Sequence, residues 1–524
     1  MSSQVNHYDK KTGNTYVYEV KSYWDKEKKS SRNRQVYLGR LDETTGTIVP
    51  SSRNKKATGQ PTESNNIVNL RVCGPNILLS RLDEELGIGK LARRYFPEIA
   101  DEMMSLVYFL AQKGLPLSRS EFWSMNHQHP FDKTIKSQRV SELLKAMDES
   151  SRQEFCSKWA SVMLENDYLC YDITSVSSYS ESNEYVKVGY NRDKENLPQI
   201  NLAMLFGQKS KLPIYYRRLP GSISDVSTLK TTLKVLNYLG LGLNSIQMVM
   251  DRGFYSIANI DDIFSHRIHF IIGVPTSRKW VEDIIDKYYE NVTSPENYYI
   301  TGEEEALFAV THLYRWGDKK RRCYLHLYYN AERAALDYDK LTRTLKECKD
   351  ELELDKPIPK HQEMYNRFFI VTETPKRGKK IEYNNDEIQK CRKRYAGFFC
   401  ILSSKLKNAI EVLDIYRTKD IVENSFDDLK NSLDMKRLRV HTSAAMDSRL
   451  FLQFLATIFV CKIRETIHNQ TDSTIKYLSV REVMEAMESL SVLSNKHKYK
   501  GVLSELTVVQ KKLAIAFGLN VLQI

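Results

Sequence analysis

Four polar side chains recur at helical spacing in the stretch YRTKDIVENSFDDLK, residues 416–430. They are Tyr416, Lys419, Glu423 and Lys430. At about 100° per residue, all four fall within a stripe about 60° wide on one side of a helix, next to a separate apolar stripe. Glu423 is therefore expected at the rim of a packed core, where a carboxylate can reach into a cleft and stay hydrated. The alternative is an ordinary surface ladder of lysine and glutamate pairs.

Two aspartates occur in apolar stretches that are typical of β-strands. In YLCYDITS, residues 168–175, Asp172 interrupts an apolar run, where an unpaired carboxylate would be costly to bury. In IQMVMDRGFY, residues 246–255, Asp251 stands where the strand gives way to a turn. For Asp251, a plain turn or cap residue is the alternative to a functional carboxylate.

Three carboxylates that converge would have a clear chemical use. They bind divalent cations, and Mg²⁺ prefers oxygen ligands while keeping waters that exchange with phosphate oxygens. Two such ions about 4 Å apart can activate a water or a 3′-hydroxyl for in-line displacement at phosphorus. This chemistry needs no nucleophilic side chain, and the sequence shows neither a Gly-rich Walker loop nor a convincing Ser-His-Asp set.

The elements that must position these acids follow from the hydrophobic periodicity. Three β runs precede a helix that starts at Asp225, and a strand, a short helix and a further strand follow. The five strands are expected at 168–176, 199–207, 212–219, 245–253 and 268–275. This order predicts an α/β fold with a mixed, ribonuclease H-like sheet. In such a sheet the end of the fourth strand lies beside the middle of the first, so Asp172 and Asp251 would face each other.

The remainder of the chain divides by composition. Alternating aromatic runs at 16–25 and 34–42 predict a β-hairpin, helical periodicity leads into the centre, and mixed β material with one charged helix interrupts the sheet. The predicted domains are a small basic hairpin domain and linker (1–66), a helical domain with a DNA-binding role (67–164), the first part of the catalytic domain (165–275), a β-rich insertion (276–395), the second part of the catalytic domain (396–460) and a helical C-terminal region (461–524).

The net charge of +12 makes a polyanion the first partner to consider. Half of the excess lies in residues 1–60, which hold 12 basic and 6 acidic side chains. The hairpin's basic residues would either bind DNA or form a solvated loop; they are Lys26, Lys28, Lys29, Arg32 and Arg34. The eight cysteines lack zinc-knuckle spacing, and the longest apolar run, 451–460, is too short to span a bilayer, so we expect reduced thiols and no membrane partner.

Several motifs together resemble a known family. They are YDITS around Asp172, the run GYNRDKENLPQINLAML at 189–205, DRGFY around Asp251 and the Tyr, basic, Glu, Lys helix. These motifs resemble bacterial insertion-sequence transposases with an Asp-Asp-Glu site, in the branch with a Tyr-Arg-Glu-Lys signature. The resemblance covers about 168–460 and implies a ribonuclease H-like catalytic domain with a β-rich insertion before Glu423.

The resemblance assigns roles to particular residues. Asp172, Asp251 and Glu423 would be catalytic ligands of two Mg²⁺ ions, with Mn²⁺ expected to substitute. Tyr416, Lys419 and Lys430 would contact the DNA end near the cleaved phosphate; the family usually has arginine where this chain has Lys419, and lysine lacks the bidentate fork. Three further residues have two possible roles each. Arg252 could bind phosphate or pair with a carboxylate, and Trp280 and Trp316 could stack on a flipped base or pack in the protein core.

The functional expectation is a transposase that binds the ends of its element, hydrolyses DNA phosphodiesters and joins the 3′-hydroxyls to target DNA by a cut-and-paste route. Its partners would be terminal inverted repeats and target DNA, bound as a homodimer on paired ends, in the bacterial cytoplasm at the nucleoid. Two alternatives remain open. One is an inactive DNA-binding derivative or transposition repressor, and the other is a ribonuclease H-like nuclease without strand transfer.

Overall fold

The computed structural model describes residues 2–25, 28–42, 46–50, 68–164, 168–180, 183–191, 193, 195–238, 246–302, 305–374, 378–433, 435, 437–438, 442–495 and 499–520. Lys26 of the expected basic hairpin and most of the expected linker, 51–66, lie outside these residues. The chain forms two compact units. The first is Met1–Asn69 with Leu493–Val502, and the second is Leu70–Val492 with Leu503–Ile524.

The first unit contains a four-stranded antiparallel sheet in the order β1-β2-β3-β4. The expected hairpin corresponds to β2 (Asn14–Asp25) and β3 (Ser30–Leu41), whereas β1 (Ser2–Asp9) and β4 (Ile48–Pro50) were not expected. Its apolar core is small, with Val17 and Val20 buried. Three tyrosines of β2 and β3, Tyr16, Tyr18 and Tyr37, stack edge-on or tilted beside them. Such cross-strand aromatic pairs stabilise a sheet this thin.

The second unit is built on a mixed sheet in the order β11-β12-β13-β16-β10-β9-β6-β7-β8, with the short β17 beside β6. Its centre confirms the predicted strand order: β6, β7 and β8 form an antiparallel meander, and β9 lies parallel between β6 and β10. The bounds are β6 Tyr168–Ser178, β7 Gln199–Gly207, β8 Pro213–Pro220, β9 Gln247–Met250, β10 His269–Val274, β16 Phe398–Ser403 and β17 Arg437–Leu438.

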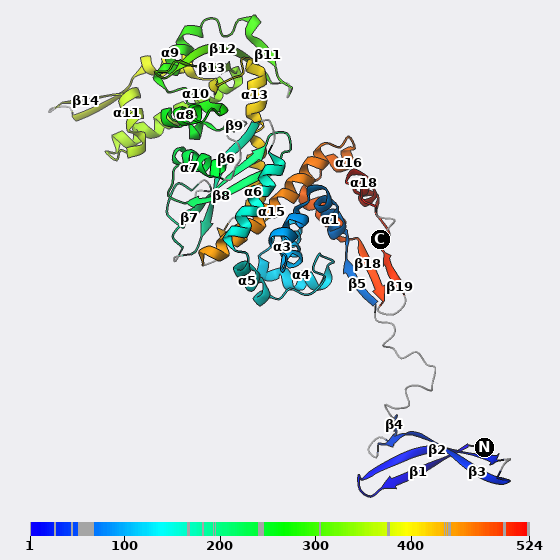
Figure 1. The fold of residues 1–524 in the computed structure, drawn as a ribbon. Coiled ribbons are helices and arrows are strands. Elements are labelled where there is room, and N and C mark those ends of the chain that lie inside the picture. Colours follow the sequence, from blue (N-terminus) through cyan, green and yellow to red (C-terminus); the bar gives the residue numbers. More distant parts are fainter. Residues whose placement is uncertain are drawn as a thin grey trace. The chain divides into compact units, whose positions relative to one another are not determined.

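Helices cover both faces of this sheet (Figure 1). On one face, α7 (Asp225–Tyr238), α8 (Ile257–Ser265) and α9 (Lys279–Tyr288) pack on residues such as Tyr171 and Met250. On the other face, α13 (Ala409–Arg417), α14 (Asp420–Asp427) and α15 (Ser443–His468) pack on residues such as Cys170 and Val249. Because side chains alternate along a strand, each strand serves both cores.

The N-terminal helices share one apolar core with α15, on the sheet face that α13 and α14 also cover. They belong to the second unit and do not form a separate one, contrary to the domain predicted at 67–164. α15 passes between β8 and the helices α1, α3 and α5 (Figure 1). The bounds are α1 Gly74–Leu86, α2 Ile88–Tyr95, α3 Ala100–Lys113, α4 Ser120–Asn126, α5 Ser137–Ala146 and α6 Glu149–Met163. Among the described residues α15 is long and apolar enough to cross a membrane, but 83% of its most apolar window is buried, as in a core helix.

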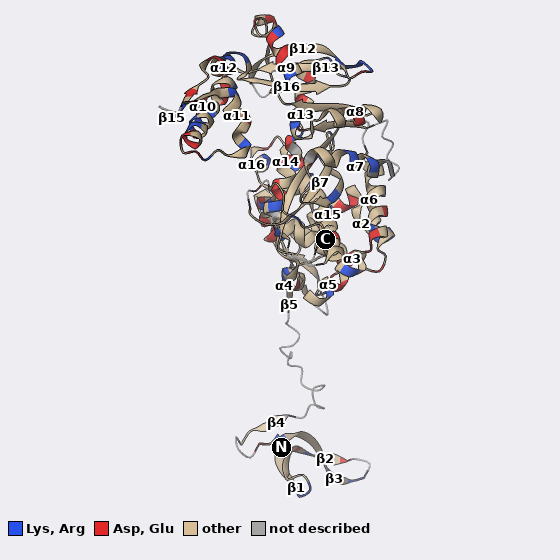
Figure 2. Cartoon of the chain, turned by 90° about the vertical axis from the view of Figure 1, so that its left-hand side faces the viewer, with Lys and Arg blue, Asp and Glu red and all other residues tan. Residues whose placement is uncertain are grey.

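The insertion expected at 276–395 is only partly separate from the sheet. β11 (Tyr298–Ile300), β12 (Ala306–Trp316) and β13 (Arg321–Tyr329) extend the central sheet, because β13 pairs with β16. The charged helix α10 (Ala331–Glu353) and a small sheet lie outside it and share their own apolar cluster. The outer elements are α11 Gln362–Phe368, β14 Phe369–Thr374, β15 Gly378–Tyr383 and α12 Asn385–Lys390. Lys, Arg, Asp and Glu are interspersed on α10 and α12, so this region is no simple cationic arm (Figure 2).

The C-terminal region expected to be helical contains α16 (Ser473–Lys476), α17 (Val480–Glu488) and α18 (Val508–Ala516). Two strands that were not expected, β18 (Ser491–Asn495) and β19 (Tyr499–Leu503), occur between α17 and α18. Together with β5 (Val68–Val72), they fall where the chain divides into its two units.

A buried histidine makes the second unit sensitive to acid. His326 in β13 is fully buried, and burial lowers its pKa to about 4, although Leu406 O accepts a hydrogen bond from its ring at 3.2 Å. In the unfolded chain His326 therefore becomes protonated below pH about 6.5, whereas in the folded chain it stays neutral down to pH about 4. We expect this group to cost up to about 3 kcal/mol of unfolding free energy across that window. Denaturant titrations at pH 7 and pH 4.5 should show a smaller loss for His326→Gln than for the wild type; equal losses would contradict this prediction.

Candidate active site

Asp172 and Asp251 lie side by side on one face of the sheet. β6 and β9 are parallel with Tyr171 opposite Met250, so the next pair in register is Asp172 and Asp251. Tyr171 and Met250 point into the core under α7 and α8, so by alternation both aspartates point to the opposite face, where α13 and α14 lie. Asp172 is partly buried, and its Oδ1 accepts a hydrogen bond from the Ile173 amide at 2.7 Å. The sheet therefore brings the two predicted acids together.

The helix that carries Glu423 is interrupted, and this corrects the continuous stripe expected at 416–430. α13 ends at Arg417, α14 begins at Asp420, and a π-helical turn, Asp428–Ser432, follows. The Thr418 hydroxyl bonds the Ile415 carbonyl oxygen at 2.6 Å, a local contact that competes with helix continuation. The polar residues of this segment therefore point to different partners, although its apolar side still packs on the sheet through buried residues such as Val422 and Phe426.

Tyr416 contacts Asp251, one of the two adjacent aspartates. Its hydroxyl donates a hydrogen bond to Asp251 Oδ1 at 3.0 Å. Burial first, and then the Asp251 carboxylate, raise the pKa of Tyr416 far above its usual value, so the phenol stays protonated. Gly273 of β10 makes room for it: a Cβ there would lie 2.5 Å from the Tyr416 hydroxyl oxygen. Ile272 is opposite Met250, so Gly273 is the next residue in register with Asp251.

Lys419 and Glu423 form an ion pair, with 2.7 Å between Lys419 Nζ and Glu423 Oε1. Burial lowers the pKa of Lys419, but the hydrogen bond to Glu423 and the nearby Asp251 carboxylate outweigh it and raise the pKa overall. The Lys419 side chain is 21% exposed and the Glu423 side chain 58% exposed. Within the described residues, the oxygens of Asp172, Asp251 and Glu423 do not all lie within 4.8 Å of one another. The structure therefore brings Asp172 and Asp251 together, whereas the third predicted acid, Glu423, is ion-paired with Lys419.

A cavity of about 310 Å³ opens beside Asp251. Tyr416 and Gly273 form part of its wall, and three cationic side chains also line it: Arg252, Lys419 and Arg333 of α10. A cavity lined by one carboxylate, Asp251, and three cations suits a phosphodiester, because the cations can offset phosphate charge and carboxylate oxygens can hold divalent ions.

The other predicted DNA contacts lie elsewhere. Lys430 has a 9% exposed side chain, and both carboxylate oxygens of Asp193 accept hydrogen bonds from it, at 2.7 and 2.8 Å.

Trp316 is buried and donates to Asp261 Oδ1 at 2.9 Å, while the partly buried Trp280 stacks on Tyr314 with 4.6 Å between ring centroids. Both tryptophans therefore pack inside the fold. In the first unit, Lys28 lies in the β2–β3 turn and Arg32 in β3, where Asp25 is 3.6 Å away.

A family model for the transposase DDE domain matches residues 165–459. The chain belongs to the transposase DDE domain family. The matched range of the DDE domain starts immediately before β6 and ends within α15, so it holds Asp172, Asp251 and Glu423 together with the strands that extend the sheet. No curated protein sequence matches the chain.

One solved structure that is similar to this chain is described as "Cryo-EM structure of piggyBac transposase synaptic complex with hairpin DNA (SNHP)". It has 12% sequence identity and a TM-score of 0.33, and the match covers 79% of this chain and 70% of that chain. At that TM-score the likeness adds nothing to the family assignment.

Sequence reasoning missed two residues that line the cavity, Gly273 and Arg333, and the partner of Lys430, Asp193. Gly273 had a usable signal, because a glycine inside the apolar run HFIIGV marks a close approach of another group. Asp193 lies in the run 189–205 that carries the family resemblance, but no pattern there indicated its pairing with Lys430. Arg333 had no signal, since it reaches the cavity from α10, far away in the sequence.

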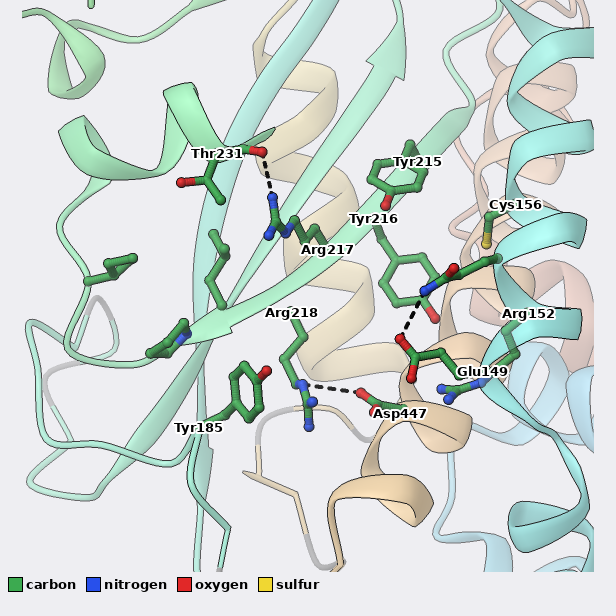
Figure 3. Close-up of a pocket in the computed structure, with 14 residues that line it drawn as sticks. Glu149, Arg152, Cys156, Tyr185, Tyr215, Tyr216, Arg217, Arg218, Thr231 and Asp447 are labelled. Atoms are coloured by element: carbon green, nitrogen blue, oxygen red, sulfur yellow. Dashed lines mark hydrogen bonds and ion pairs between the residues drawn. The ribbon is translucent and has the colours of Figure 1, made fainter. Parts of the chain in front are cut away.

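In two other polar clusters of this chain, the polar side chains contact one another. A hollow of about 370 Å³ lies beside β8 (Figure 3), where Arg218 is 3.1 Å from Asp447 and 3.7 Å from the Tyr185 ring centroid. Near α10, potential ligand atoms of Cys348, Glu351 and His361 lie within 4.8 Å of one another. There Glu351 already accepts hydrogen bonds from the His361 ring and the Tyr365 hydroxyl, as in a structural network.

Proposed function

We propose that the chain is a DNA transposase of the bacterial insertion-sequence type, with a ribonuclease H-like catalytic core, that cleaves DNA at the ends of its element and joins the 3′-hydroxyls to target DNA. The observation that carries this proposal is the adjacent register of Asp172 and Asp251 on one sheet face, within the matched DDE domain. The meander of β6, β7 and β8 followed by the parallel β9 and β10 supports the ribonuclease H-like assignment.

The donor set fits a hard divalent cation. Asp172 and Asp251 offer carboxylate oxygens from neighbouring strands, and Glu423, on the segment that covers them, would complete the set. We propose Mg²⁺ as the resident ion, with Mn²⁺ as a substitute. When bound, it would supply an activated water or 3′-hydroxyl and stabilise the leaving oxygen at phosphorus.

The chain's own residues would bind and orient the DNA. Arg252, Arg333 and Lys419 present positive charge to a phosphate in the cavity, and Tyr416 holds Asp251 in place through its hydroxyl. Lys419 has a second role in this proposal. An arriving DNA phosphate competes with Glu423 for the Lys419 ammonium, which releases Glu423 to turn towards the aspartates.

The proposed partners are terminal inverted repeats and target DNA, bound by a homodimer on paired ends. The strand Ser30–Leu41 and the turn before it carry Lys28 and Arg32, which support an accessory DNA contact by the first unit. The proposed setting is the bacterial cytoplasm, at the nucleoid.

A strand-joining assay tests this proposal. Purified protein, Mg²⁺, a target plasmid and an oligonucleotide with the exposed 3′ end of the element should yield covalent joint molecules. Glu423→Gln should abolish joining, whereas Asp427→Asn, which removes an exposed charge one turn along α14, should not. Joining that survives Glu423→Gln would remove Glu423 from the mechanism, and cleavage without joining would indicate the nuclease.

An inactive DNA-binding derivative is the second candidate, and one observation favours it. Glu423 is paired with Lys419 and not gathered with the aspartates. Tight, metal-independent binding of the element end with no cleavage in either Mg²⁺ or Mn²⁺ would indicate this function.

A further inference from the structure

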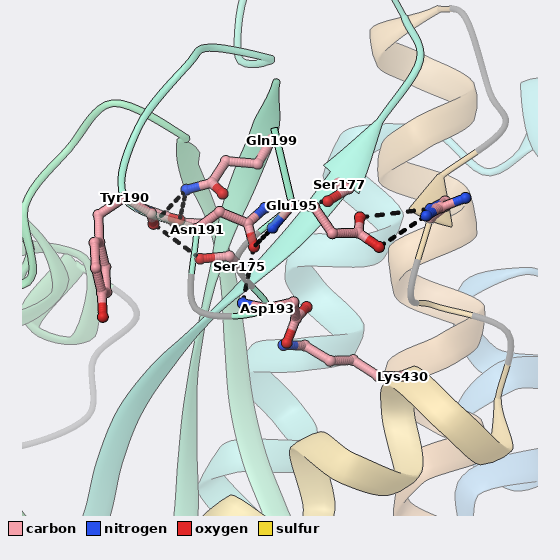
Figure 4. Close-up of polar contacts among 10 residues, drawn as sticks. Ser175, Ser177, Tyr190, Asn191, Asp193, Glu195, Gln199 and Lys430 are labelled. Carbon is pink, nitrogen blue, oxygen red and sulfur yellow. Dashed lines mark hydrogen bonds and ion pairs between the residues drawn. The ribbon is translucent and has the colours of Figure 1, made fainter. Parts of the chain in front are cut away.

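The connection between β6 and β7 is folded back onto the sheet by a polar network (Figure 4). Asn191 is its centre: its side-chain amide donates to Ser177 Oγ at 3.1 Å, and its Oδ1 accepts from the Asp193 amide at 2.8 Å. Gln199 and Ser175 both donate to the Tyr190 carbonyl oxygen, at 2.8 and 3.3 Å. The loop is thus fixed to the strand that carries Asp172, a few residues beyond it.

From this fixed loop, Asp193 reaches the segment that carries Glu423. Its two oxygens accept hydrogen bonds from Lys430 Nζ at 2.7 and 2.8 Å. Lys430 lies in the π-helical turn Asp428–Ser432, directly after α14, and its side chain is 9% exposed against 24% for Asp193. A partly buried, doubly bonded ion pair of this kind has a defined geometry, and removing one partner leaves a charge buried without compensation.

A second ion pair repeats the connection two residues further along the loop. Glu195 lies 2.9 Å from Arg437, which also donates to the Tyr179 hydroxyl at 2.9 Å. Arg437 begins β17, whose residues pair in parallel with Ser177 and Ser178 of β6. The two ion pairs therefore connect the turn after α14 and the start of β17 to the loop that follows β6.

We propose that Asp193, supported by Glu195, is a positioning residue that sets the place of Glu423 relative to Asp172, and that Lys430 acts through Asp193 and not as a contact to DNA. This inference rests on the proposed transposase function. The loop fixes one end of the Glu423 segment to β6, while the bond between Tyr416 and Asp251 fixes the other end to β9. Glu423 lies between these two anchors along the chain.

The two roles for Lys430 predict opposite results for Asp193. If Lys430 contacts DNA, Asp193→Asn frees its charge, and DNA affinity rises or stays the same with no loss of joining. If Asp193 positions Glu423, the same change displaces the segment, and single-turnover joining at saturating DNA falls by about 100-fold while the dissociation constant for the element end changes little. Glu184→Gln, an exposed acid in the same loop, is the matched control and should leave both values unchanged.

The charge-swapped double variant Asp193→Lys with Lys430→Asp is the decisive arm. We expect Lys430→Asp alone to lose joining and the swap to regain at least about tenfold, because the ion pair is restored while position 430 has lost its cation. Lys430→Arg, which keeps the pair, should also remain active if the swap does not fold. Weakened DNA binding in every variant that lacks a cation at 430, without rescue by the swap, would overturn the inference. A wild-type protein that joins no DNA would instead overturn the proposed function.

Discussion

Asp251→Asn is expected to reduce cleavage and strand joining by more than about 100-fold, because loss of even an outer partner of a metal ligand typically costs 10- to 100-fold. The substitution keeps the size of the side chain and its capacity to accept from Tyr416, and it removes only the negative charge. Folding and binding of the element end should therefore be retained. Single-turnover joining rates at saturating DNA, measured alongside gel-shift affinities, separate these effects.

Asp172→Asn should give a loss of similar size, and the double variant should be little worse than either single one, because residues that act as a unit are not additive. Asp318→Asn, in the exposed turn after β12, is the matched control for an aspartate outside the site. An Asp251→Asn protein that joins DNA at the wild-type rate would show that the adjacent aspartates are not the reactive centre.

Gly273→Ala is expected to have the second largest effect. The new Cβ would lie 2.5 Å from the Tyr416 hydroxyl oxygen and 3.0 Å from Arg252 Cβ, so Tyr416 must leave Asp251. We expect a loss of about 1–3 kcal/mol of unfolding free energy from overpacking, together with a marked loss of joining. Chemical denaturation and joining rates measure the two losses.

The double variant Gly273→Ala with Tyr416→Phe tests the cause. Phenylalanine lacks the oxygen that the new Cβ meets, so the double variant should unfold less easily than Gly273→Ala alone. Since Tyr416→Phe by itself removes a hydrogen bond of 3.0 Å, this rescue is a coupling between two damaging changes. Additive free-energy losses would contradict the close approach of Gly273 to Tyr416.

The parts of the site that could be predicted from sequence are those fixed by strand order. Asp172 and Asp251 each end or interrupt an apolar run, and the order of strands and helices between them placed the fourth strand beside the first. Alternation along the strands then put both carboxylates on one face. These inferences depend on local periodicity and a connection rule, and both can be read from a single sequence.

The helix that carries Glu423 could not be predicted in the same way. An ideal wheel assumes one unbroken helix, whereas Thr418 bonds back to Ile415 and the turn after α14 closes with a bond from the Leu433 amide to the Asp428 carbonyl oxygen. The apolar side of the segment still packs as the wheel predicted, but Lys419 and Lys430 have different partners, Glu423 and Asp193. The partner of Lys430 is Asp193, 237 residues earlier, and no local pattern indicates so distant a contact. Likewise, the pairing of β13 with β16, which joins the insertion to the sheet, depends on tertiary contact alone.

Anomalous scattering from Mn²⁺ in the complex with element-end DNA would show directly whether the two aspartates hold the metal. We expect manganese within about 2.2 Å of carboxylate oxygens of both Asp172 and Asp251, with Glu423 turned from Lys419 towards the same ions. Manganese absent from Asp172 and Asp251, or bound only at Cys348, Glu351 and His361, would contradict it.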